Sequence, residues 1–274
     1  MAECKNRIRI DLRRAIWSGG FLIAIVATVV VQAQAVFEEY LKTKGDVLYY
    51  LSLTLQTGEM QVLMPSIASL CFSGVFFQDY HDGFFIYEQI RGNVNTYLLS
   101  KAVACWISAF LAVVLGMCIF IFCIALKFPL LSDASYVNMN AYQTDSFGEL
   151  LAHHHYIAFI AIRILTRGIS AGAWAVVALA VSPFCRERFI LHSAPFLLSY
   201  FSSWILTRAG FRLTFLKLDT GYTSGAYQMH MVGQATWVIL LVYGITTILG
   251  FAIFSFGAKR RMAYGYAKNC FLPF

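Results

Sequence analysis

Charged residues are scarce in this sequence, where Asp, Glu, Lys and Arg together make up 13% of 274 residues. Soluble domains carry about a quarter charged residues, because their surfaces face water. Hydrophobic residues reach 59% and aromatic residues 16%. This balance excludes an ordinary soluble globular domain and predicts a membrane protein.

Motifs of self-contained enzymes are also missing. The sequence has no GxxxxGK[ST] phosphate-binding loop, no HExxH and no CxxC pair with zinc spacing. Neither a nucleophile elbow nor a Ser/His/Asp arrangement can be assigned. His153, His154 and His155 are consecutive, so on a helix they point about 100° apart and cannot converge on one ion. We therefore expect no catalytic residue, metal site or cofactor on this chain, and we do not expect an enzyme.

Long apolar runs, bounded by charge, proline or polar clusters, predict an all-α polytopic membrane protein with six transmembrane helices. A helix needs roughly 20 mostly apolar residues to cross the hydrocarbon. In the second run, we expect Pro65 to break the outer end of the helix. The six expected spans are Ala15 to Phe37, Glu59 to Phe77, Leu98 to Leu126, Tyr156 to Phe184, Phe189 to Thr207, and Val232 to Gly257.

The distribution of basic residues predicts that both termini are cytoplasmic, because Lys and Arg are enriched in short cytoplasmic connections. The net charge of +7 does not indicate nucleic acid, since the bases lie in short stretches between apolar runs and suit anionic lipid head groups. The expected cytoplasmic bases are Lys5, Arg7, Arg9, Arg13, Arg14, Arg91, Lys101, Arg186, Arg188, Lys259, Arg260, Arg261 and Lys268. The opposite side holds Lys42, Lys44, Lys127, Arg208, Arg212 and Lys217.

The start of the chain has a second interpretation. A basic start, an apolar core over 21–31 and Ala33-Gln34-Ala35 resemble a secretory signal with its cleavage site. We favour a retained first span, because cleavage would leave five spans and spoil the charge asymmetry.

We expect one transmembrane domain over residues 1–274. Within it, apolar residues at helical spacing among arginines predict an amphipathic, interfacial helix at the N-terminus. The other parts are a cytoplasmic segment after the second span, two external loops and a basic cytoplasmic tail. Their ranges are 1–16 for the amphipathic segment, 78–97 for the cytoplasmic segment, 128–155 and 208–231 for the loops, and 258–274 for the tail.

The connection after the second span is longer than a turn needs, and it combines aromatic and charged residues. A short helix with an apolar face and a charged rim suits docking into a groove of a partner protein. The alternative is an amphipathic turn that rests on the lipid. The candidate partner-binding residues are Asp79, Asp82, Gly83, Phe84, Phe85, Tyr87, Glu88 and Arg91.

These features resemble the membrane subunits of type-2 ATP-binding-cassette exporters. The resemblance covers the six-span hydropathy, the basic N-terminal helix and an acid-rich segment that leads to a lysine opening span three. The matching positions are Asp79 and Asp82 for the acids, Gly83 for the glycine, Tyr97 for the aromatic residue and Lys101 for the lysine. The segment departs from the family pattern in lacking a Glu before the glycine and a Pro further on. In the family, this region is a coupling helix that seats on an ATPase subunit.

The resemblance implies a permease of the bacterial plasma membrane that works by alternating access with a separate ATPase subunit. ATP and Mg would bind on that partner, because this chain carries no phosphate-binding loop. A substrate path would need a second membrane subunit, identical or homologous. The substrate class we expect first is a peptide or antimicrobial peptide, followed by amphipathic drugs or lipids.

Arg163 and Arg167 are four residues apart and lie on one face of the fourth expected span. Charges at membrane depth are costly and usually face protein or water. One interpretation is a cationic strip along the path of an anionic substrate or lipid. The other is snorkelling of both guanidinium groups to lipid phosphates.

Two further function classes remain. A transporter powered by an ion gradient would normally place an ionisable residue near the bilayer midplane, and apart from Arg167 no expected span has one there. A membrane-embedded hydrolase or transferase should show converging acid, base or metal groups at one depth, and none is evident.

Overall fold

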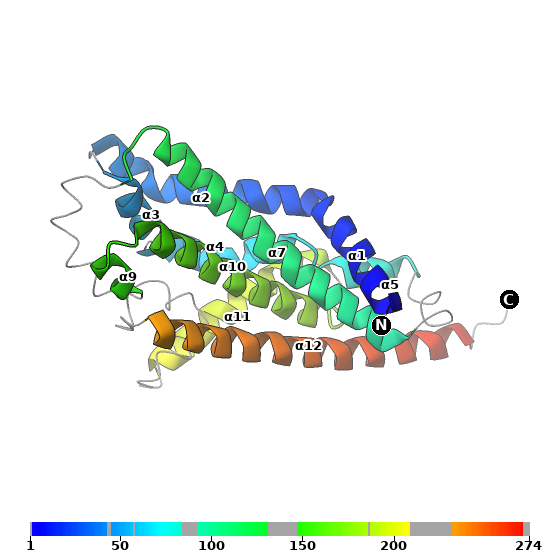
Figure 1. Ribbon diagram of the computed structural model, residues 1–274. Helices are drawn as coiled ribbons and strands as arrows, with labels where there is room; N and C mark the ends of the chain where they lie inside the picture. The colour runs from blue at the N-terminus through cyan, green and yellow to red at the C-terminus, as the bar shows by residue number, and fades with distance from the viewer. Residues whose placement is uncertain are drawn as a thin grey trace.

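The computed structural model describes residues 2–42, 45–56, 58–83, 93–130, 147–185, 187–208 and 232–270. These residues are helical and contain no strand. The long helices are joined by short ones, as Figure 1 shows. The elements are α1 (Ala2–Ile16), α2 (Gly19–Lys42), α3 (Val47–Gln56), α4 (Gly58–Leu70), α5 (Val75–His81), α7 (Val94–Ala125), α9 (Gly148–Ala152), α10 (Tyr156–Val181), α11 (Arg188–Arg208) and α12 (Val232–Cys270).

Among the described helices, four are long and apolar enough to cross a membrane, namely α2, α7, α10 and α12. In α12, large apolar side chains such as Trp237, Leu241 and Ile248 lie on the outside of the bundle. A helix that is apolar on both its packed and its outer face is typical of a membrane span. The structure therefore agrees with a membrane protein. The fifth expected span corresponds to α11, whose apolar stretch is shorter and runs over Phe189–Ser202.

The second expected span is not one continuous helix. It divides into α4 and α5, with a turn at residues 71–74 between them. Pro65 lies inside α4, so our prediction that Pro65 breaks this span was wrong. A proline removes one backbone hydrogen bond and kinks a helix, but it does not have to end it.

The break between α4 and α5 occurs where the chain meets the start of α2. A Cβ atom on Gly20 would lie 2.1 Å from the Leu70 carbonyl oxygen, so only glycine allows this close approach. Ser18 Oγ lies 3.2 Å from the Cys71 carbonyl oxygen and donates to it. The Ser18 hydroxyl, just before α2, therefore satisfies one backbone carbonyl at the break.

Other boundaries also differ from expectation. The last helix, α12, continues to Cys270, past the expected end at Gly257, so part of the expected basic tail is helical. The short helices α3 and α9 were not predicted from the sequence. Of the expected external loops, residues 131–146 and 209–231 lie outside the described part of the chain.

Helix α10 lies at the centre of the bundle and packs against α7, α12, α4 and α11. Small residues make the contact with α7 close. A Cβ atom on Gly168 would lie 2.7 Å from Val114 Cγ2, and one on Gly172 would lie 2.7 Å from the ring of Trp106. The GxxxG spacing thus serves packing within this chain.

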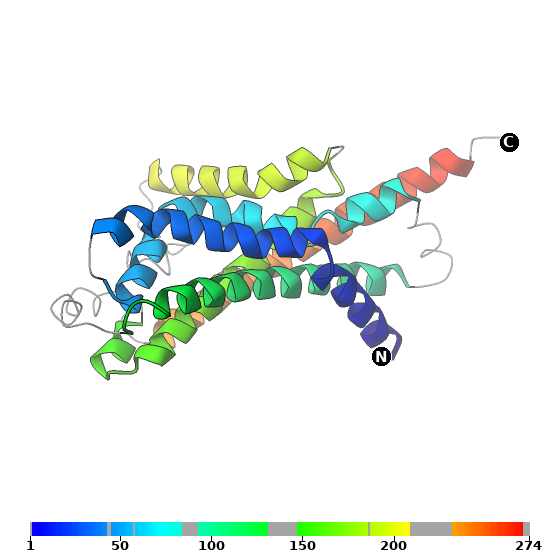
Figure 2. The same ribbon diagram turned by 90° about the horizontal axis from the view of Figure 1, so that it is seen from above.

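The two ends of the bundle carry different short elements. In Figures 1 and 2, α1, α5 and the C-terminal part of α12 lie at one end, and α3 and α9 lie at the other. We call the end that carries α1, α5 and the C-terminal part of α12 the α5 end.

Candidate functional site at the α5 end

Helix α5 is short, and a glycine ends it. Gly83 has φ of 71°, a left-handed conformation that only glycine adopts readily. The Asp82 N–H donates to the Gln78 carbonyl and the Gly83 N–H donates to the Tyr80 carbonyl. These bonds satisfy carbonyls at the end of the helix.

Asp79 of α5 is buried and is held by three side chains from two other helices. Arg14 of α1 donates to Oδ1 at 3.0 Å, and Tyr97 Oη of α7 donates to Oδ2 at 2.9 Å. Lys101 Nζ, also from α7, lies 3.1 Å from Oδ2. The carboxylate therefore joins α5 to both α1 and α7.

Lys101 connects Asp79 to a second carboxylate. Its Nζ atom donates to Asp11 Oδ1 of α1 at 2.7 Å, while Ser100 Oγ donates to Asp11 Oδ2 at 2.7 Å. The Lys101 ammonium also lies 5.1 Å from the centroid of the Tyr97 ring. The Lys101 side chain is only 3% exposed. We call Asp11, Arg14, Asp79, Tyr97 and Lys101 the acid–base hub.

Two carboxylates and two bases balance within the acid–base hub. Buried ions are tolerated when each has a partner of opposite charge and its remaining hydrogen bonds are satisfied. Removing one partner leaves an uncompensated charge and costs about 3–5 kcal/mol. The hub therefore fixes the relative positions of α1, α5 and α7.

The neighbouring residue on α5, Tyr80, contacts a different pair of helices. The Arg261 guanidinium of α12 lies 4.3 Å from the centroid of the Tyr80 ring, a cation–π contact. One nitrogen of Arg261 also donates to the carbonyls of Ser182, Pro183 and Cys185, at 3.2, 3.0 and 3.0 Å. A cation at these carbonyls stabilises the C-terminus of α10. Arg261 thus joins α5 to α12 and α10.

Cys185 lies beside this contact. Burial raises the pKa of its thiol, and the positive charge of Arg261 opposes part of that shift. The thiol therefore stays protonated at neutral pH and is a poor nucleophile.

The predicted partner-binding residues fall into three groups. Asp79 is buried in the acid–base hub, whereas the side chain of Asp82 is 59% exposed and Gly83 ends α5. The structure thus gives the two acids different surroundings. The remaining predictions, Phe84, Phe85, Tyr87, Glu88 and Arg91, lie outside the described residues.

Sequence reasoning missed Asp11 and Arg261 as structural partners. A signal for Asp11 was present, because it lies three residues after Ile8 and four before Ala15, on the apolar face of α1. An acid on such a face indicates a buried base opposite. For Arg261, the sequence shows only a basic cluster after an apolar run. Such a cluster is explained by the orientation of the chain in the membrane and does not indicate a tertiary contact.

The structure places Arg163 and Arg167 inside the bundle, at 2% and 0% exposure. The Arg163 guanidinium lies 4.9 Å from the centroid of the Phe159 ring. Arg167 donates to Met64 Sδ at 4.0 Å. This burial argues against snorkelling to lipid phosphates.

The three consecutive histidines form the turn between α9 and α10 and do not lie on one helix. His153 follows the last residue of α9, His154 has a φ of 59°, and His155 precedes α10. His154 Nδ1 lies 2.7 Å from Tyr156 Oη. The described residues contain no group of three His, Cys, Asp or Glu that is placed to hold a metal ion.

Comparison with known proteins gives no match, whether to a protein-family model, to a curated protein or to a solved structure.

Proposed function

We propose that this chain is the membrane subunit of an ATP-driven exporter and that its energy comes from a separate ATPase subunit. In this proposal the α5 end faces the cytoplasm, the chain crosses the plasma membrane six times, and the ATPase docks on the segment that follows α5. The observation that supports the proposal most strongly is the position of α5 between two sets of long helices.

Adjacent residues of α5 contact different long helices. Asp79 is bound to α1 and α7 through the acid–base hub, and Tyr80 is bound to α12 and α10 through Arg261. Any displacement of α5 therefore changes contacts with both groups of helices. A ligand or partner shifts a conformational equilibrium only through contacts that differ between the two states. These paired contacts are suited to that task.

The exposed end of α5 is the natural docking point. Asp82 is exposed, and the chain continues from Gly83 into a segment rich in Phe, Tyr and charged residues. Aromatic anchors with a charged rim are typical of protein interfaces. Asp82 lies outside the acid–base hub, and apart from an exposed contact with His81 at 3.7 Å it is the α5 acid placed to meet a basic partner surface.

A second membrane subunit would complete the substrate path. Arg163 and Arg167 lie in the central helix α10, where they would contact an anionic amphipathic substrate once the bundle opens. A peptide or antimicrobial peptide is the first substrate class to test, then drugs and lipids.

A transporter driven by an ion gradient is the main alternative. Asp11 and Asp79 are buried carboxylates. Both lie at the α5 end of the bundle, where they pair with Lys101. Their positions favour a structural role over ion coupling near the midplane.

The test is affinity purification of the tagged full-length chain from its native membranes, followed by mass spectrometry. We expect a protein that contains GxxxxGK[ST] to co-purify with the wild type. Changing Phe84, Phe85 and Tyr87 to Ala should abolish its recovery. The matched control changes exposed aromatic residues elsewhere, Phe37→Ala and Phe122→Ala, and should retain the ATPase. Uptake into vesicles that is driven by a pH gradient without ATP would contradict the proposal.

A further inference from the structure

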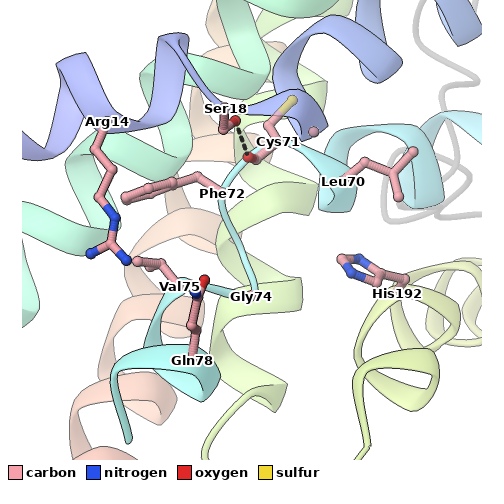
Figure 3. Close-up of a pocket in the computed structure, with 10 residues that line it drawn as sticks. Arg14, Ser18, Leu70, Cys71, Phe72, Gly74, Val75, Gln78 and His192 are labelled. Carbon is pink, nitrogen blue, oxygen red and sulfur yellow. Dashed lines mark hydrogen bonds between the residues drawn. The ribbon is translucent and has the colours of Figure 1, made fainter. Parts of the chain in front are cut away.

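A cavity of about 280 Å³ lies beside the acid–base hub, where the α1–α2 junction, the α4–α5 break and α11 meet. Figure 3 shows its lining residues. Four polar side chains line it, Arg14, Ser18, Gln78 and His192, and no carboxylate does. We propose that this cavity binds the phosphate head group of an anionic membrane lipid.

The cation in the cavity is held in place. Arg14 NH1 is bound to Asp79 at 3.0 Å, yet the Arg14 side chain remains 45% exposed. A guanidinium has five N–H donors, so one bond to Asp79 leaves others for an oxyanion. Preorganised guanidinium groups are favoured partners of phosphate.

Two further groups surround the same space. Gln78 is exposed on α5, one residue before Asp79, and supplies an amide N–H. His192 of α11 is oriented by Ser69, whose Oγ lies 3.1 Å from Nδ1. In Figure 3, Arg14 and Gln78 lie on one side and His192 on the other. Polar side chains from three helices therefore converge on one cavity.

The lining also contains three large apolar side chains, which favours a lipid over a soluble anion. Leu70, Phe72 and Val75 face the cavity. The volume is slightly below the ~300 Å³ at which pockets for whole small molecules begin. It suits a phosphate and its glycerol, with the acyl chains leaving along the apolar outer surface of the bundle.

The cavity also lies at the depth where head groups are expected. Trp17, between Arg14 and Ser18, is 83% exposed, and Ile10, two turns earlier, is 67% exposed. Exposed tryptophan beside basic residues marks the membrane–water interface. Arg13 on the same helix is exposed and adds positive charge around the site. This inference stands independently of the proposed ATPase partner.

The test is native mass spectrometry of the purified full chain with dioleoylphosphatidylglycerol or dioleoylphosphatidylcholine. We expect the wild type to retain phosphatidylglycerol about fivefold more strongly, which is the ratio that one basic residue near the membrane surface supplies. Gln78→Glu should remove most of this preference, and Gln78→Lys should increase it. Both changes are at an exposed position outside the acid–base hub, so the fold should persist.

The control is His81→Glu. His81 lies on the same helix and its side chain is 80% exposed, but it does not line the cavity. This change also introduces a carboxylate on α5, so an equal loss of lipid in both variants would overturn the proposal. Displacement of bound phosphatidylglycerol by millimolar inorganic phosphate would also overturn it, because the site would then belong to a soluble anion.

Discussion

The acid–base hub and the contact between α10 and α7 hold helices together by different means. In the hub, Lys101 lies within 3.1 Å of two carboxylates, and the two carboxylates of the hub are matched by its two bases. In the centre of the bundle, Gly168 and Gly172 bring α10 against the side chains of α7, and contacts are mainly those of close-packed apolar groups. Arg167 lies among these groups, and one of its contacts is the sulfur of Met64.

The difference indicates that the two regions tolerate different changes. Electrostatic contacts at the α5 end are directional, and they fail when one charge is lost. Close packing in the centre fails when volume is added, because protein interiors contain little free space. A substitution that is severe in one region should be mild in the other.

Lys101→Met should have the largest effect. It leaves Asp11 and Asp79 buried without their shared cation, at a cost of about 3–5 kcal/mol of unfolding free energy. Thermal unfolding of the purified chain in detergent measures the loss. Asp11→Asn and Asp79→Asn, added to Lys101→Met, should recover part of it, because the unpaired carboxylate charges are removed. A loss below about 1 kcal/mol for Lys101→Met would show that the hub contributes little, as exposed ion pairs do.

Gly172→Val should come next. Its Cβ atom would lie 2.7 Å from ring atoms of Trp106, so α10 and α7 must separate, at a cost of about 1–3 kcal/mol. Gly244→Val on α12 is the matched control, because a Cβ atom there meets nothing within 4 Å. The same unfolding measurement compares them. Equal stability of the two variants would contradict close packing at Gly172.

Arg261→Met should be milder. It removes the hydrogen bonds to the end of α10 and the contact with Tyr80, but retains an aliphatic stem, so we expect a loss of about 1.5 kcal/mol. Lys259→Met, at an exposed position of α12, should change the unfolding free energy by less than about 0.5 kcal/mol. If the two variants were equally stable, the contacts of Arg261 would not stabilise the fold, and its charge would only help to set the orientation of the chain in the membrane.

The smallest expected effect concerns Cys185. Its raised pKa means that the protonated thiol is favoured in the folded chain. The associated stability is present below the unfolded pKa of about 8.5 and is lost as pH rises through the folded value. Maleimide labelling followed by peptide mass spectrometry should therefore be slow at neutral pH and accelerate only in strongly alkaline buffer. Rapid labelling at neutral pH would contradict burial of this thiol.

Much of the fold could be predicted from hydropathy, because the apolar runs of α2, α7, α10 and α12 are long. The break after Leu70 could not, since it depends on the approach of Gly20 from a distant part of the chain. Nor could the sequence place Pro65 inside a helix, because proline both kinks and ends helices.

The candidate site was predictable only in part. The sequence singled out Asp79, Tyr97 and Lys101. That Tyr97 and Lys101 both contact the Asp79 carboxylate, and that Lys101 also pairs with Asp11, became known only from the tertiary structure. Arg163 and Arg167 illustrate the same limit. Their spacing places them on one face of α10, but it does not say whether that face meets lipid or protein.

Photocrosslinking from position 82 in living cells tests the central proposal most directly. A photoreactive amino acid replaces Asp82, which is exposed at the end of α5, and a second variant carries it at Phe122, which is exposed on α7 far from that end. The account predicts a crosslink from position 82 to a cytoplasmic protein that contains GxxxxGK[ST], and none from position 122. A crosslink from position 82 to proteins outside the cell would contradict it.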